Sequence, residues 1–437
     1  MLKTLRNIWK VKDLRKKFIY TFFVLLVVLL GCQLPIPGLD NAAISEYFQN
    51  SLGDSFSLIN SFTGGSFENM SILALNVTPY ITASIIMQLL TIAIPALEEM
   101  HKDGEEGRKK MNKITRYMTV ALGILEGLGT SIGFGRLGYM DEYNAFNVAL
   151  MVFCLTTGGV FVMWLGERIT ENGIGNGISI ILLINIVSRM PNDFYTLYQK
   201  FMQGKAIGDM LIAGTIIVVV VVATTLLVTM FQSAERRIPV QYAKKMAGRK
   251  MVGGQQTYIP LKVSTANVIP VIFASSLMSF PAVISNLFSV DETGFWGKVL
   301  KVLSSSSWCD PNHPARSVGL LVYVILIFLF AYFYTSITFN PIEVANNMKK
   351  SGGFIPGIRP GKPTSDYLNS ILNSVIFIGA LGLSIVAIIP IFFSGVFKAN
   401  VSFGGTSIII VVGVILETIK QIESQMLVRH YKGFLND

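Results

Sequence analysis

The chain has 437 residues, of which 51% are hydrophobic and 14% are charged, and its formal net charge is +10. Soluble domains carry about 25% charged residues, so the composition excludes an ordinary soluble globule of this size. The Lys and Arg residues occur in blocks separated by long apolar runs, and none lies between Phe18 and His101. We therefore expect a membrane protein with basic loops, and the positive charge does not indicate nucleic-acid binding.

The chain contains ten apolar runs that we expect to cross a bilayer as helices. Leu-Pro-Ile-Pro follows the first run in place of a small-residue cleavage site, so this run is expected to be a retained span and not a signal peptide. The second run is preceded by two glycines and interrupted by Pro79, and the fifth is short. The expected spans are 18–34, 72–94, 114–134, 146–166, 177–190, 210–231, 264–284, 318–339, 367–390 and 406–427.

The distribution of basic residues predicts the orientation. With the N-terminus in the cytoplasm, 28 of the 36 Lys and Arg residues fall on the inner side and the other 8 on the outer side. Because cytoplasmic loops carry an excess of Lys and Arg, both termini are expected in the cytoplasm. The two largest basic loops on that side are 232–263 and 338–366.

Ten spans divide into two groups of five, and an odd number of spans in each group gives the groups opposite orientations. We therefore expect an all-α polytopic membrane protein with ten transmembrane helices in two inverted five-helix halves around a central pore. The N-terminal half would comprise 1–190 and the C-terminal half 210–437, joined by an outer connecting loop at 191–209.

Charged residues inside the spans distinguish a channel from a secondary transporter, which usually keeps ionisable groups near the bilayer midplane. The clear exceptions to the apolar pattern are Glu126 in the third span and Glu417 in the tenth. Glu417 lies one turn before Lys420, which favours an ion pair on the helix face. A channel is the preferred interpretation. A transporter that uses Glu126 as a proton or cation site is the alternative, and a scaffold for other membrane proteins is a third possibility.

The signatures of an enzyme are absent from the sequence. No Gly-x-x-x-x-Gly-Lys-Ser/Thr motif and no plausible catalytic constellation occurs. Cys32, Cys154 and Cys309 are scattered and give neither a metal-binding spacing nor a disulfide framework. We expect no enzymatic activity, no cofactor and no metal, so the energy for transport has to come from a partner.

Pairs of aliphatic residues follow helical spacing in two spans. Ile81 and Ile85 share one face of the second span, and Leu182 and Ile186 share one face of the fifth. Spacing alone is equally typical of ordinary packing or lipid contact. If these residues converged with others from the seventh and tenth spans, they would form an apolar constriction that blocks ions by dewetting and deforms around a moving chain.

Six stretches, in order along the chain, resemble the SecY family of bacterial protein-conducting channels, and together with the ten-span topology the resemblance covers essentially the whole sequence. They read PYITASIIMQLL (79–90), GIGNGIS (173–179), RRIPVQYAKK (236–245), VIPVIFASS (268–276), FIPGIRPG (354–361) and GGTSI (404–408).

The resemblance implies roles for individual residues. The pore ring would consist of Ile81, Ile85, Leu182, Ile186, Ile272 and Ile410. A short half-helix, the plug, would close the outer funnel and consist of Ser61, Phe62, Thr63, Gly64, Gly65, Ser66, Phe67, Glu68, Asn69 and Met70. Spans two and three would meet spans seven and eight at a lateral gate to lipid, tuned by Gln88, Ser275 and Ser276. The partner-binding residues of the two basic loops would be Arg236, Arg237, Lys244, Lys245, Arg249, Lys250 and Arg359.

The resemblance also implies partners and a location. SecE and SecG would complete the core complex, and the motor ATPase SecA or the translating ribosome would dock on the basic loops. Guanidinium groups suit both ribosomal RNA phosphates and carboxylates. The clients would be unfolded preproteins that carry signal sequences, and transmembrane segments would pass through the lateral gate into membrane lipid. The expected location is the bacterial plasma membrane.

Overall fold

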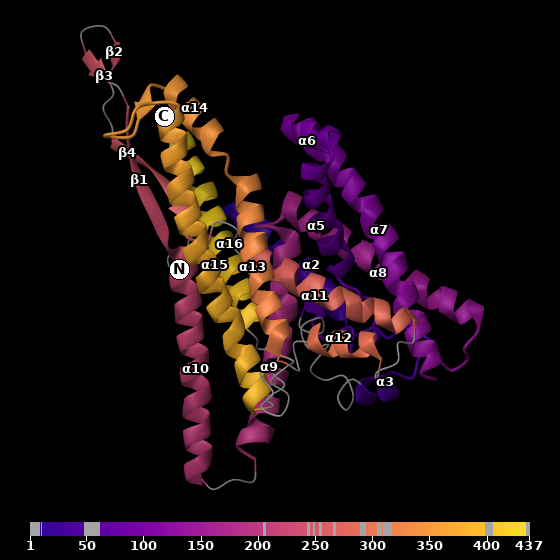
Figure 1. The fold of residues 1–437 in the computed structure, drawn as a ribbon. Coiled ribbons are helices and arrows are strands. Elements are labelled where there is room, and N and C mark those ends of the chain that lie inside the picture. Colours follow the sequence, from indigo (N-terminus) through magenta and orange to yellow (C-terminus); the bar gives the residue numbers. More distant parts are fainter. Residues whose placement is uncertain are drawn as a thin grey trace.

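The structure is a computed structural model, and the residues that it describes are 9, 11–47, 62–203, 207–242, 245–247, 250–252, 256–264, 268–288, 294–303, 308, 317–397 and 405–433. Helices dominate the described chain, and short strands gather at one end of it (Figure 1). Of the predicted site residues, Ser61, Lys244 and Arg249 lie outside the described residues.

Each of the ten predicted spans corresponds to a helix. Those of the first half are α2 (Lys12–Gly31), α5 (Thr78–Ala93), α7 (Gly104–Arg136), α8 (Ala145–Asn172) and α9 (Gly177–Phe201). Those of the second half are α10 (Ile207–Ser233), α11 (Ile269–Phe288), α13 (Val318–Thr338), α15 (Lys362–Phe397) and α16 (Gly405–Gly433). The shorter helices are α3 (Asn41–Tyr47), α6 (Pro95–Lys102), α12 (Phe295–Leu303) and α14 (Pro341–Lys350).

Several helix limits differ from those expected. Pro79 does not interrupt the second span, because residues 72–77 are turns and α5 begins at Thr78 with the proline in its first turn. A proline is tolerated there because the first amide groups of a helix have no partner within the helix. The fifth span is not short: α9 continues through Pro191 to Phe201, so much of the expected loop 191–209 is helical.

Length and composition alone identify fewer spans than ten. Among the described helices, α7, α8, α10, α13 and α15 are long and apolar enough to cross a bilayer. The total is six if α5 and α6, which meet at a bend of 108°, count as one span. Helix α9 carries Asn185, Arg189 and Asp193 among its apolar residues. Its polar content reflects contacts inside the protein, described below.

The two long basic loops form one sheet, which the sequence did not predict. Strands β1 (Glu235–Tyr242) and β4 (Gln256–Lys262) pair antiparallel, and β5 (Gly353–Phe354) joins the other edge of β1. A separate hairpin consists of β2 (Lys245–Ala247) and β3 (Lys250–Val252). The sheet lies at the same end of the molecule as α6 and α14, whereas α3 lies at the opposite end (Figure 1).

The sheet is fixed to the helices by its own small core. Ile238 and Val240 alternate with exposed residues along β1, as expected for a strand with one buried face. They cluster with Leu261 of β4 and with residues of the helices beneath, including Met348 of α14 and Leu368 of α15. Burial of this face fixes the register of the sheet on the helices.

Close approach of α8 to the segment before α5 depends on a glycine. A Cβ atom added to Gly158 would lie 1.9 Å from the carbonyl oxygen of Ile72, whereas one added to Gly159 would lie 3.5 Å from the nearest atom, the carbonyl oxygen of Asn76. The first distance is a clash with backbone, and the second is ordinary contact.

We therefore expect Gly158→Ala to destabilise the protein and Gly159→Ala to have little effect. Overpacking of this kind costs about 1–3 kcal/mol, which would lower the midpoint of thermal unfolding of the detergent-purified protein. Equal midpoints for the two variants would contradict the close approach.

Candidate functional site: an apolar cluster and the segment held against it

The six predicted ring residues lie in or against one hydrophobic cluster. Ile85 of α5, Leu182 and Ile186 of α9 and Ile410 of α16 are buried members with 9%, 5%, 4% and 1% of their surface exposed. Ile81 of α5 and Ile272 of α11 are partly buried and pack against the same cluster. Four helices that are distant in sequence thus contribute branched aliphatic side chains to one cluster.

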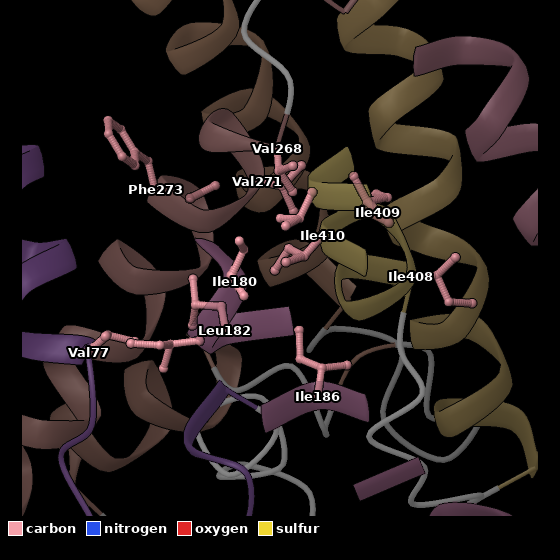
Figure 2. Packing of buried hydrophobic residues seen from close by; sticks show 14 of the residues in the cluster. Val77, Ile180, Leu182, Ile186, Val268, Val271, Phe273, Ile408, Ile409 and Ile410 are labelled. Atoms are coloured by element: carbon pink, nitrogen blue, oxygen red, sulfur yellow. The ribbon is translucent and has the colours of Figure 1, made fainter. Parts of the chain in front are cut away.

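The cluster extends beyond these six residues. Figure 2 shows Leu182, Ile186 and Ile410 together with further buried aliphatic residues, among them Ile180 and Val271. A contact of aliphatic side chains offers no partner to a hydrated ion, and it has no hydrogen bonds that would fix one arrangement. The geometry therefore suits a seal that can deform.

The segment predicted as the plug lies against this cluster on α9. Phe62 packs against the same cluster, and the amide nitrogen of Asn185 donates to the Phe62 carbonyl oxygen at 3.1 Å. Asn185 lies between the ring residues Leu182 and Ile186 in sequence. In its described part, 62–70, the segment is not the expected half-helix: residues 62–63 are helical and 64–70 form turns.

The turns need glycine at two positions. Gly64 and Gly65 have φ angles of +67° and +84°, in the left-handed region that disfavours side chains. An added Cβ on Gly64 would also lie 3.2 Å from the Cα atom of Asn185. The glycines therefore both reverse the chain and let it approach α9 closely.

The carbonyl oxygen of Thr63 anchors the other side of the segment. It accepts hydrogen bonds from the Ser66 hydroxyl at 2.7 Å and from the Asn76 amide at 3.4 Å, and the Cys32 thiol lies 4.0 Å away. The Ser66 hydroxyl lies 3.0 Å from the Leu73 carbonyl oxygen as well. These bonds fix the segment to the turns that lead into α5 and to the end of α2.

A charged pair also joins the segment to α9. Arg189 Nη2 lies 3.1 Å from Glu68 Oε2, and the two side chains are only 15% and 17% exposed. The sequence indicated Glu68 but neither Arg189 nor Asn185. The signal was present, because Leu182, Asn185, Ile186 and Arg189 follow the spacing i, i+3, i+4, i+7 of a single helix face.

The predicted gate residues lie on α5 and α11. Helix α11 contacts both α7 and α13, and α5 contacts α7, as a closed lateral gate between these helices requires. The Ser275 hydroxyl donates to the Ile272 carbonyl oxygen of its own helix at 2.9 Å. Ser276 is half-buried, and the side-chain oxygen of Gln88 is buried without a hydrogen-bond partner in the described part of the chain.

The predicted partner-binding residues of the two loops that are described, which exclude Lys244 and Arg249, lie on or beside the strands. Arg236 and Arg237 are exposed on β1, and Arg359 is exposed after β5. Arg237 stacks over the Tyr258 ring at 4.8 Å and contacts Glu235 at 2.7 Å, and these contacts raise its pKa. Lys245 and Lys250 lie in the β2–β3 hairpin. Pairing of β1 with β5 brings the two basic loops together.

Gln232 is a further residue that the sequence did not indicate. It is buried at the end of α10, and its amide nitrogen donates to the Ile409 carbonyl oxygen at 2.9 Å. Ile409 precedes the predicted ring residue Ile410, so Gln232 fixes the α16 backbone next to the ring.

The two carboxylates expected inside the spans have different surroundings. Glu126 is half-buried on α7. Glu417 and Lys420 are both exposed on α16, and within the described part of the chain they do not form the expected ion pair. The described residues contain no group of three or more His, Cys, Asp or Glu side chains that could hold a metal ion.

A helical membrane protein in which several helices contribute to one aliphatic cluster, with a segment of turns held against it, has an architecture that suits a channel. The SecY family model matches residues 71–419. The chain is 44% identical over 454 residues to the protein translocase subunit SecY of Streptomyces galbus and 43% identical over 445 residues to that of Halalkalibacterium halodurans, and each comparison covers both chains completely. The chain belongs to the SecY family.

Solved structures support the fold. One described as a protein conducting channel superposes with a TM-score of 0.63 at 17% identity, covering 94% of this chain and 92% of the other. Sec61 in the canine ribosome–channel complex from the endoplasmic reticulum gives a TM-score of 0.62 at 16% identity, with the same coverage. The predicted ten-helix polytopic class is thereby confirmed. The chain is a protein-conducting channel subunit and not an enzyme, so the transporter interpretation based on Glu126 is set aside.

Proposed function

We propose that unfolded secretory polypeptides pass between α5, α9, α11 and α16 through a ring of Ile81, Ile85, Leu182, Ile186, Ile272 and Ile410. The observation that carries this proposal is the convergence of these residues on one cluster, with 62–70 held against the same face of α9. At rest the ring excludes ions and the plug, 61–70, covers it. During transport the ring widens around the chain and the plug moves aside.

A lateral gate between α5 and α7 on one side and α11 and α13 on the other would release transmembrane segments into lipid. The contact of α7 with α11 supports this arrangement. Gln88 would tune the gate, because a buried oxygen without a hydrogen-bond partner weakens the closed state by about 1–3 kcal/mol. Ser275 and Ser276 would contribute from α11. The driving force for release is burial of the apolar surface of the segment in lipid.

The partners follow from the basic sheet and from the relatives. SecA or a translating ribosome would dock on the sheet through Arg236, Arg237 and Arg359, aided by Lys244, Lys245, Arg249 and Lys250, and SecE and SecG would complete the complex. The proposal of the ribosome as a partner is supported by Sec61, which shares the fold and was solved in a ribosome–channel complex. The bacterial relatives support a location in the plasma membrane. The excess of Lys and Arg at the end that carries the sheet supports an orientation with both termini in the cytoplasm. Residues 1–190 and 210–437 would be the two inverted halves.

The direct test is reconstitution into proteoliposomes with SecE, SecG, SecA and ATP. A preprotein with a signal sequence should become protected from added protease only when ATP is present. Absence of protection, with the same partners active on a control channel, would overturn the proposed transport.

The ring is tested by Ile85→Asn and Ile410→Asn. A buried amide without a partner should destabilise the closed state by about 1–3 kcal/mol, which corresponds to a roughly 5- to 150-fold rise in the open population. Export of preproteins with defective signal sequences should rise accordingly in cells. Ile85→Leu, which keeps volume and polarity, is the matched control. Unchanged stringency in both Asn variants would remove these residues from the ring.

The plug is tested by deleting 61–70. Loss of the cover should raise the ion conductance of the resting channel complex in planar bilayers. A resting conductance equal to that of the intact channel would contradict the assignment.

The docking surface is tested by Arg359→Glu. Reversal of this exposed charge should lower SecA-driven export by about tenfold, a loss of about 1.4 kcal/mol, while the protein still inserts into the membrane. Lys362→Glu is the matched control, because Lys362 is also exposed three residues away. Normal export by Arg359→Glu would exclude Arg359 from the site.

A further inference from the structure

One face of α9 carries two different sets of residues. Leu182 and Ile186 belong to the apolar cluster, and Asn185 and Arg189 hold the 62–70 segment. Because the four residues share a face, a movement of α9 that separates Leu182 and Ile186 from the other helices also displaces Asn185 and Arg189. The seal and the attachment of the segment are therefore mechanically coupled.

The attachment of the segment to α9 depends on Arg189 at close range. Its guanidinium contacts the Glu68 carboxylate and lies across the turn at Gly65, where an added Cβ would be 3.1 Å from Arg189 Nη1. Removal of Glu68 would leave the Arg189 guanidinium mostly buried without its carboxylate partner, which is costly. The pair thus favours the arrangement in which the segment lies against α9.

The same contact is incompletely satisfied. Arg189 Nε and Nη1 and the side-chain oxygen of Asn185 are buried without hydrogen-bond partners among the described residues. Such groups gain hydrogen bonds when water reaches them, so exposure to an open, wet pathway compensates for part of the broken ion pair. The ion pair therefore stabilises the closed state, and hydration of the unsatisfied groups lowers the free energy needed to break it.

The opposite side of the segment has different partners. The Thr63 carbonyl oxygen is bonded to Ser66 and Asn76, and the Ser71 amide donates to the Ser66 carbonyl oxygen at 2.9 Å. These bonds are local, within the chain that leads into α5. The segment can therefore leave α9 while it remains attached at this side.

We propose that Arg189 is a specificity-determining residue of the channel: through Glu68 it latches the 62–70 segment to the helix face that carries the ring, and the strength of this latch sets how effective a signal sequence must be to open the channel. The inference rests on the proposed plug role of 61–70. It predicts that ring opening and segment release occur together.

The test uses the full chain in its membrane complex, with resting conductance in planar bilayers and export of a preprotein with a defective signal sequence as the two readouts. Arg189→Met and Glu68→Gln should each raise both readouts roughly tenfold. The double variant Glu68→Arg/Arg189→Glu restores opposite charges and should return both to within about threefold of the original protein. A purely structural loss would not be rescued by this exchange, and the amount of complex in the membrane reports on folding.

Arg168→Met is the matched control, because Arg168 forms an exposed ion pair with Glu171 on α8 and should leave both readouts unchanged. If deletion of 61–70 raises conductance but the single variants do not, the latch is overturned and the plug role stands. If the deleted channel stays tight, the plug role fails and the latch fails with it. Single variants that leak but are not rescued by the charge exchange would also overturn the latch.

Discussion

A channel for unfolded protein has to exclude ions at rest and still accept side chains of every kind, and the proposed ring of aliphatic side chains from α5, α9, α11 and α16 would meet both demands. Aliphatic surfaces give no binding site to an ion, and their attraction does not depend on direction. The helices that supply these side chains come from both ends of the chain. Packing outside the cluster also positions these helices, since Gly158 lets α8 approach the segment that leads into α5 closely.

Polar side chains occur within this apolar surrounding where they hold the 62–70 segment in place by contacts that can be broken. Residues 64–70 form turns, and irregular backbone of this kind is tolerated at membrane depth only inside protein. The carbonyl groups of the segment are bonded by Asn185, Asn76 and Ser66, and its carboxylate by Arg189. Gln232 serves a related purpose on α10, where its amide nitrogen donates to the Ile409 carbonyl oxygen and holds the backbone beside Ile410. Polar side chains thus fix the positions of backbone segments that aliphatic packing alone does not define.

The sequence predicted the spans because hydropathy is a local pattern, and each of the ten corresponds to a helix. Helical spacing and the SecY motifs led to the proposed ring, and the structure places residues such as Ile85 and Ile410 in one buried cluster. The sequence could not predict where helices end, since α9 continues past Pro191 in a stretch that is no longer apolar. The two-residue strand β5 has no periodicity of its own and exists only by pairing with β1. Arg189 lies in the predicted fifth span, 177–190, but its contact with Glu68 joins residues 121 positions apart, and helical spacing does not reveal such a partner.

The pairing of Gln241 with Phe354 and of Tyr242 with Gly353 has a mechanical consequence. It joins two loops that are separated by about a quarter of the chain, and the resulting sheet continues directly from α10 and rests on α14 and α15. The sheet thus connects both basic loops to α10, α14 and α15 through backbone pairing and a shared apolar core. Contact at either loop therefore bears on the same three helices.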